Sequence, residues 1–150
     1  TDNDLLQREI ADILGVNRNT YPHWEAGLYE MPLEIIDKLA NYYNVSVDYL
    51  TGLSNYKGKA GRIYDAKISA KRIYTMRKSK KLSQEKMSEM MPGMSQMKLS
   101  RYENSVTAVP LSKLYLIAKT FNISMDYLMG KTDEIDIIKR VPETTKNETN

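Results

Sequence analysis

Apolar side chains recur at helical spacing in two stretches of the chain. In the first stretch they are Leu33, Ile36, Ala40 and Tyr43, and in the second they are Leu111, Leu114, Ala118 and Phe121. Side chains three or four residues apart lie on one face of a helix, so each stretch predicts an amphipathic helix that buries this face. Shorter amphipathic stretches lie upstream of each, and no segment has the alternation typical of a strand. The pattern therefore predicts an all-α fold.

The two stretches belong to a longer internal repeat. When residues 24–52 are compared with residues 102–130, a shift of 78, ten of the 29 positions are identical. Upstream the shift drops to 77 and pairs Gln7 with Gln84, with one residue added near Pro92 and Gly93. Two copies at this spacing are too few for a solenoid and indicate two tandem small domains. We expect domains at residues 1–55 and 67–131, a linker at 56–66, and a short apolar segment followed by a disordered tail at 132–150.

Each predicted helix is followed by the motif Asn-(Val/Ile)-Ser-x-Asp-Tyr-Leu and, two residues later, by Gly. The Ser of the motif predicts an N-cap for a new short helix, and the Asp falls in its first turn, where the helix dipole favours a negative charge. The Gly is expected to end this helix. These residues are Ser46, Asp48 and Gly52 in the first copy and Ser124, Asp126 and Gly130 in the second.

The middle of the second copy predicts two short helices joined by a tight turn. Ser83 precedes a helix over residues 84–91, Pro92 and Gly93 form the turn, and Ser95 precedes a helix over residues 96–104. In the latter helix Leu99 and Tyr102 can face the core, while the outward positions hold Gln96, Met97, Ser100 and Arg101. This is the plan of a helix-turn-helix, whose second helix enters the major groove of DNA. A helical bundle with a solvated polar face fits the same pattern.

Both copies resemble the phage-repressor (Cro-like, XRE-type) helix-turn-helix family. The segments that carry the resemblance are Leu82-Ser83-Gln84-Glu85-Lys86, Leu99-Ser100-Arg101-Tyr102-Glu103 and Asn122-Ile123-Ser124-Met125-Asp126-Tyr127-Leu128, with counterparts in the first copy that include Gln7-Arg8-Glu9-Ile10-Ala11 and Trp24-Glu25. The resemblance implies five-helix domains that bind double-stranded DNA, usually as dimers, and that repress or activate transcription.

The resemblance assigns roles to individual residues of the second copy. Gln84 is expected to anchor a backbone phosphate, and Gln96, Met97 and Arg101 occupy the base-reading positions. Met97 can offer only an apolar contact, such as one to a thymine methyl group. The DNA-contacting set is Gln84, Ser95, Gln96, Met97, Lys98, Ser100, Arg101 and Asn104, with phosphate contacts expected for Lys98 and Asn104. The family pattern also implies a structural ion pair between Arg77 and Glu103.

The first copy departs from the family in two ways. Only six residues precede Gln7, so this sequence is expected to lack the first helix of that copy. Pro22 removes a donor and crowds a carbonyl within the reading helix, which should be shorter or distorted unless its cap shifts to Asn19 or Thr20. The DNA-contacting candidates carried over to this copy are Gln7, Asn17, Arg18, Asn19, Thr20 and His23.

Charge separates the copies further. Residues 1–56 hold three basic and nine acidic side chains, a net charge of −6, whereas residues 57–131 hold sixteen basic and five acidic ones, a net charge of +11. Because phosphate neutralisation supplies much of the affinity for DNA, the second copy is expected to contribute most of it.

The composition argues against catalysis and against a membrane protein. With no cysteine and a single histidine, the chain lacks a thiolate, a His-rich or Cys-based metal site and a nucleophile–base pair, so we expect a protein that is not an enzyme and needs no metal or cofactor. No apolar run approaches the ~20 residues of a membrane span. The N-terminal residues lack the order of a signal peptide, so we expect a cytoplasmic protein.

The sequence thus predicts a sequence-specific DNA-binding transcriptional regulator, a repressor, of bacterial or mobile-element origin. We expect a homodimer, with contacts from residues 135–141 or the last helix of either copy; the competing idea is that the tandem copies make one chain sufficient for two adjacent sites. The alternative function is a protein–protein adaptor or antitoxin-like module whose first copy binds a protein partner and no longer binds DNA.

Overall fold

The computed structural model describes residues 31–139, and every regular element in this part of the chain is a helix. The first copy contributes α3 (Leu33–Tyr43) and α4 (Val47–Leu50), and the second contributes α5 (Ala66–Ser79), α6 (Gln84–Glu89), α7 (Gln96–Glu103), α8 (Leu111–Phe121) and α9 (Met125–Leu128). The predicted all-α class is confirmed. Expectations that fall on residues 1–30 and 140–150, among them the effect of Pro22 and the disordered tail, lie outside the described residues.

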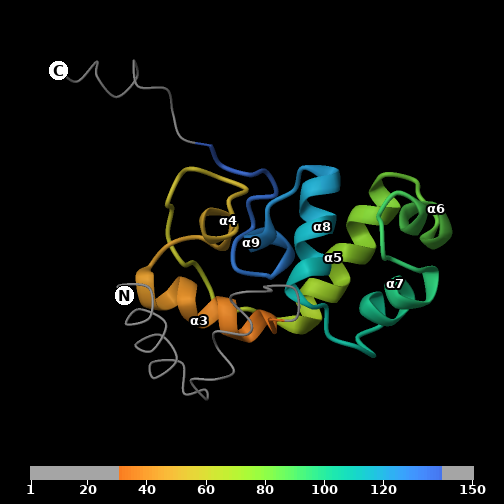
Figure 1. The fold of residues 1–150 in the computed structure, drawn as a ribbon, viewed down its shortest axis with the longest axis horizontal. Coiled ribbons are helices and arrows are strands. Elements are labelled where there is room, and N and C mark those ends of the chain that lie inside the picture. Colours follow the sequence, from red (N-terminus) through yellow and green to blue (C-terminus); the bar gives the residue numbers. More distant parts are fainter. Residues whose placement is uncertain (1–30, 140–150) are drawn as a thin grey trace.

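The second copy forms a five-helix unit, with α8 and α5 at the centre of the molecule (Figure 1). Helices α6 and α7 lie at one end, α3 and α4 lie at the other, and α9 lies beside α4 (Figure 1). The periodic apolar positions supply the core, since Ile73, Leu99, Leu114 and Leu128 are fully buried. Apolar residues of α3 belong to the same core, so the two copies share one interior.

The short helices begin and end where the repeated motif predicts. The hydroxyl of Ser46 accepts a hydrogen bond from the backbone N–H of Tyr49 at 3.0 Å, and that of Ser124 accepts one from Tyr127 at 3.1 Å. The preceding helices, α3 and α8, both end at an Asn in the left-handed region, with φ of 52° at Asn44 and 55° at Asn122. Asn tolerates this conformation better than most residues, so it ends each helix without glycine.

Two buried carboxylates join the copies at the starts of α4 and α9. Asp126 accepts hydrogen bonds from the backbone N–H groups of Val47 and Asp48, both at 2.9 Å. In return Asp48 accepts from the N–H of Met125 at 2.7 Å and from the hydroxyl of Ser124 at 2.6 Å. Both Asp residues do lie in the first turn of their own helix, but each carboxylate caps the helix of the other copy.

A buried ion pair forms a second link between the copies. The Lys131 ammonium, which follows α9 and is fully buried, pairs with the Asp37 carboxylate of α3 and donates to the carbonyl of Arg62 at 2.9 Å. Asp37 also accepts from the N–H of Tyr64 at 3.2 Å. Residues 56–66, which the sequence predicts as a linker, therefore contribute backbone contacts to this link, while the domain boundaries themselves stay a prediction.

Close packing of this segment requires glycine at residue 61. Gly61 has a φ of +75°, and a Cβ added there would lie 2.6 Å from the carbonyl oxygen of Lys131. The neighbouring N–H of Arg62 donates to that same oxygen at 2.9 Å. Both the backbone conformation and the close approach exclude a side chain at this point.

Burial, together with the negative charge of the nearby Asp48, raises the pKa of Asp126 to about 7. The hydrogen bonds that Asp126 accepts from the N–H groups of Val47 and Asp48 act in the opposite direction. The folded protein therefore retains a proton that the unfolded chain releases near pH 4. The stability contributed by this proton is complete below about pH 4 and is lost as the pH rises to about 7.

We expect Asp126→Asn to flatten the pH dependence of stability. The variant loses one oxygen that accepts a capping hydrogen bond, and its side chain cannot ionise. We expect it to be less stable than the native chain at pH 5, and this difference in unfolding free energy should shrink by about 2 kcal/mol between pH 5 and pH 7. Urea unfolding at a series of pH values measures this difference. Glu89→Gln, which removes an exposed acid 4.0 Å from Lys86, is the control and should follow the native profile. Parallel profiles for Asp126→Asn and the native chain would contradict the assignment.

Candidate nucleic-acid interface

Helices α6 and α7 are each started by a serine and joined by a glycine turn. Ser83 accepts from the N–H of Lys86 at 3.0 Å, and Ser95 accepts from the N–H of Lys98 at 3.1 Å. Between the helices Gly93 takes a φ of +78°, which a β-carbon would disfavour. Local capping and one permissive turn residue therefore produce the two-helix arrangement expected from residues 83–104.

Helix α7 has one buried face and one exposed face. Leu99 and Tyr102 are buried, whereas Gln96, Lys98 and Arg101 are exposed. Met97 is 66% exposed, which is unusual for a large apolar side chain on a polar face. The exposed face combines groups that can make paired hydrogen bonds to base edges with one that can contact a thymine methyl group.

A buried ion pair holds α7 against α5. Arg77 Nε donates to Glu103 Oε2 at 2.7 Å, and Arg77 Nη2 donates to Glu103 Oε1 at 2.9 Å, with side chains only 8% and 3% exposed. These are the two residues for which the family pattern implies an ion pair. The hydrogen bonds to Glu103 raise the pKa of Arg77 above its usual value, since they stabilise the charged form.

The same carboxylate also positions α6. The Gln84 side-chain amide donates to Glu103 Oε1 at 3.1 Å, and the third guanidinium contact of Arg77 goes to the carbonyl of Leu82 at 2.8 Å. Glu103 thus connects α5, α6 and α7 through two partners. Gln84 is half-buried beside an open hollow lined by basic and polar groups that include Lys78, Lys81, Ser83 and Gln96. Its contact with a phosphate stays a prediction.

Two further predicted contact residues are engaged within the domain while remaining exposed. Lys98 donates to the carbonyl of Gly93 at 3.2 Å, and Lys113 of α8 donates to the same oxygen at 3.0 Å. The side-chain amide of Asn104 donates to the carbonyl of Ser100 at 2.8 Å. An ammonium group has three donors, so Lys98 retains hydrogens for a phosphate. Ser95 caps α7, and Ser100 is half-buried.

Part of the basic charge of the second copy is structural. Arg72 of α5, one of the sixteen basic residues of this copy, donates to the carbonyls of Tyr127 and Thr132, both at 2.6 Å. Arg62 and Arg72 both pair with Asp133, and the hydrogen bonds from Arg62 and then Arg72 lower the pKa of that carboxyl. Together with Arg77 and Lys131, these groups are committed to the fold. Net charge alone could not separate them from the exposed ones.

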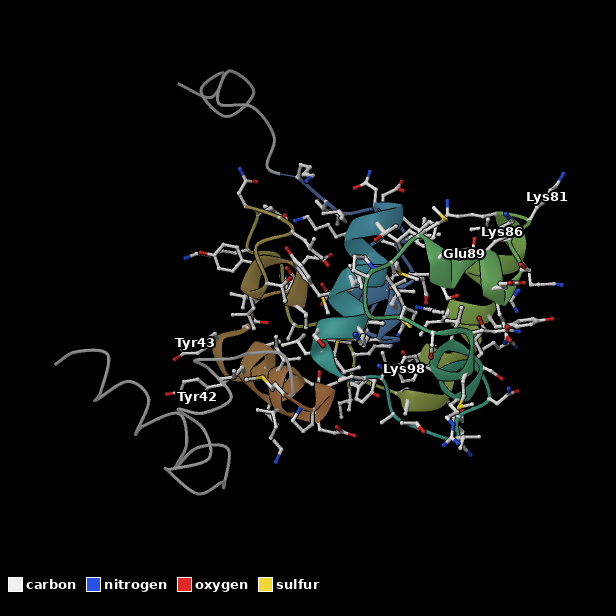
Figure 2. The ribbon with its side chains drawn as sticks, turned by 45° about the vertical axis from the view of Figure 1, so that its right-hand side comes forward. Tyr42, Tyr43, Lys81, Lys86, Glu89 and Lys98 are labelled. Carbon is white, nitrogen blue, oxygen red and sulfur yellow. The ribbon has the colours of Figure 1, made fainter. Side chains whose placement is uncertain are left out.

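The exposed basic groups nearest the helix-turn-helix are Lys78, Lys80, Lys81, Lys86, Lys98 and Arg101. Figure 2 shows Lys81, Lys86 and Lys98 on the half of the molecule that carries α6 and α7, while Tyr42 and Tyr43 project from the opposite end. These exposed cations thus lie on α6 and α7 and at the adjoining end of α5. Within residues 31–139 no group of three metal-ligating side chains is present, and no helix there has the length and apolar character to cross a membrane.

The first-copy candidates Gln7, Asn17, Arg18, Asn19, Thr20 and His23 lie outside the described residues. Their contact with DNA stays a prediction.

Comparison with protein families finds two matches along the chain. The helix-turn-helix family model matches residues 2–50 and again residues 73–128. These segments correspond to the two copies of the repeat and cover more than half of the sequence.

The chain is also similar to two curated bacterial and phage proteins. It is 41% identical over 46 residues to the cryptic phage CTXphi transcriptional repressor RstR of Vibrio cholerae, covering 31% of this chain and 41% of that protein. It is 34% identical over 65 residues to the uncharacterized HTH-type transcriptional regulator YobD of Bacillus subtilis (strain 168), covering 43% of this chain and 57% of that protein. The match thus spans about half the length of these relatives. No solved structure matches the chain.

We expect Arg77→Ala to destabilise the protein by about 3–5 kcal/mol, because it leaves the Glu103 carboxylate buried without its charged partner. Urea unfolding measures the loss. Lys78→Ala changes the neighbouring exposed residue of the same helix and should stay within about 0.5 kcal/mol of the native chain. In the double variant Arg77→Ala/Glu103→Ala, the total loss should be smaller than the sum of the single losses. Strictly additive losses would show that the two side chains do not stabilise each other.

Proposed function

This chain belongs to the helix-turn-helix family, and we propose that it is a sequence-specific DNA-binding transcriptional regulator that acts as a repressor. The observation that carries the proposal is the exposed face of α7. It presents Gln96, Met97 and Arg101 to solvent while Leu99 and Tyr102 bury the opposite face. In a helix-turn-helix, side chains so placed reach base edges in the major groove.

The distribution of charge supports double-stranded DNA as the partner. Residues 57–131 carry a net charge of +11, and Lys98 and Arg101 of α7 are exposed. Lys98 beside the turn and Asn104 at the end of α7 are the residues proposed to contact the phosphate backbone. Such contacts fix the register of a protein on DNA, and base contacts then supply specificity.

Repression rests on likeness to a phage protein that is named a transcriptional repressor. A reporter gene placed behind the bound DNA sequence tests the sign of regulation, and expression that rises with the protein would show an activator. The same proposal places the protein in the cytoplasm, where it meets chromosomal or phage DNA. No step of it calls for a cofactor or a catalytic group.

The two copies are proposed to contribute unequally. Residues 1–56 carry a net charge of −6, so the first copy opposes the approach of a polyanion, whereas the second copy attracts it. The charge difference also suits the alternative function, in which the first copy binds a protein. Variants in each copy separate these two functions.

We expect Arg101→Ala to weaken binding by about 1–3 kcal/mol and to relax preference at one base pair, as for loss of a bidentate contact to guanine. Lys98→Ala should weaken binding to all sequences alike and lower the salt slope by about one unit. Selection from randomised duplexes supplies the DNA, and titrations across salt concentrations supply both quantities. Absence of any selected sequence would contradict sequence-specific recognition.

Arg18→Ala and His23→Ala are the matched variants in the first copy, since His23 aligns with Arg101. We expect both to bind DNA almost as tightly as the native chain. If they lose as much affinity as Arg101→Ala, both copies read DNA. The adaptor alternative is favoured instead if Arg101→Ala and Lys98→Ala leave DNA binding unchanged.

A further inference from the structure

The contacts between the two copies are related by the same shift of 78 residues that relates the sequences. Asp126 caps α4 through the N–H groups of Val47 and Asp48, and Asp48 caps α9 through Met125 and Ser124. The bond from the Val47 N–H to Asp126 and the bond from the Met125 N–H to Asp48 are equivalent under this shift. Two equivalent elements that each supply what the other lacks form the arrangement found at a two-fold interface.

The segments that follow α4 and α9 obey the same relation. The N–H of Ser46 donates to the carbonyl of Lys57 at 2.7 Å, and the N–H of Ser124 donates to that of Ile135 at 3.0 Å, again 78 residues on. Near the starts of α3 and α8, the equivalent residues Met31 and Val109 are both buried. The N–H of Leu111 donates to the carbonyl of Met31 at 3.2 Å, a one-way contact between the copies. The relation thus extends beyond the carboxylates.

The surfaces expected to support a homodimer are used inside this arrangement. The last helices of the two copies, α4 and α9, contact each other. From residues 135–141, the carbonyl of Ile135 accepts from Ser124, and the carbonyl of Ile138 accepts from the Ser54 hydroxyl at 2.5 Å. Residues 140 and 141 lie outside the described part of the chain. A second chain would have to displace these contacts before it could use the same faces.

The buried ion pair between the copies does not follow the symmetry. Lys131 of the second copy pairs with Asp37 of the first, whereas the positions equivalent to them hold Leu53 and Tyr115. Two second copies paired with each other would each leave a Lys131 ammonium facing an uncharged Tyr115. Two first copies would each leave an Asp37 carboxylate facing Leu53. An unpaired buried charge is strongly unfavourable, so this site favours unlike copies over like ones.

We propose that α4 and α9 form a closed interface within one chain, an internal counterpart of a homodimer interface, so that the protein is a monomer. The covalent link through residues 56–66 makes the pairing intramolecular and gives it an advantage over pairing between chains. Contacts of Arg62 and Tyr64 with Lys131 and Asp37 hold that link along the interface. This inference favours the tandem arrangement over the homodimer as the way to bring two copies together.

Sedimentation of the native chain and amide hydrogen exchange test the proposal together. We expect the mass of one chain, 17.3 kDa, at all concentrations, with strong protection of the Val47, Asp48 and Met125 amides, whose acceptors lie in the other copy. A dimeric mass would overturn the proposal, because pairing would then occur between chains. A monomer whose three amides exchange freely would also overturn it, because the copies would then be unpaired.

The variant Asp126→Ala provides an independent arm. It should raise exchange at Val47 and Asp48 by about tenfold or more, as expected for lost hydrogen bonds to a carboxylate, while Tyr49 keeps the cap from Ser46. Glu34→Ala removes an exposed acid from the first turn of α3 and serves as the control. It should leave hydrogen exchange at the Val47, Asp48 and Tyr49 amides unchanged. Unchanged hydrogen exchange at the Val47 and Asp48 amides in Asp126→Ala would contradict the capping of α4 by Asp126. Loss of DNA binding would bear on the proposed function and leave this test unaffected.

Discussion

Two buried carboxylates between the copies organise the chain. Asp48 and Asp126 are both buried, and each satisfies backbone N–H groups at the start of a helix that it does not belong to. Helices of four residues have little stability of their own, so an external acceptor matters more for them than for long helices. The arrangement ties the formation of each short helix to the presence of the other copy.

A second network, centred on Glu103, sets the geometry of the helix-turn-helix. Its carboxylate accepts from Arg77 of α5 and from Gln84 of α6 while lying at the end of α7. The angle at which α7 is presented therefore depends on a charge that never reaches the surface. The exposed face can vary in sequence while this internal brace stays in place. A site built on a rigid, internally braced helix is positioned more accurately than one built on a loop.

Much of this architecture could be predicted from the sequence because its causes are local. Helical periodicity, serine caps and turn glycines act over a few residues, and α6 and α7 begin and end close to where these signals place them. The Arg77–Glu103 contact came from the family pattern. The capping of α4 by Asp126 and of α9 by Asp48 was not predicted, because an Asp in the first turn of a helix is already explained by the dipole of that helix. Only the repetition of the whole motif indicated that each Asp has a counterpart in the other copy.

The roles of individual cations were equally hard to read. Lys131 and Arg72 add to the basic charge of the second copy in the sequence. Yet Lys131 lies in the core beside Asp37, and Arg72 donates to one carbonyl within α9 and to another that follows it. Their fate depends on long-range packing, which periodicity does not encode. Counting charges overestimated how much of the positive charge of the second copy is free.

Pairing two non-identical copies in one polypeptide changes how the molecule can evolve. In a symmetric homodimer every substitution appears twice, so both halves must change together and a palindromic target is imposed. Here a change in α7 alters one half alone, and the asymmetric Lys131–Asp37 contact keeps the halves in a fixed order. One gene can therefore change the exposed positions of its two halves independently, as long as the contacts between them are kept.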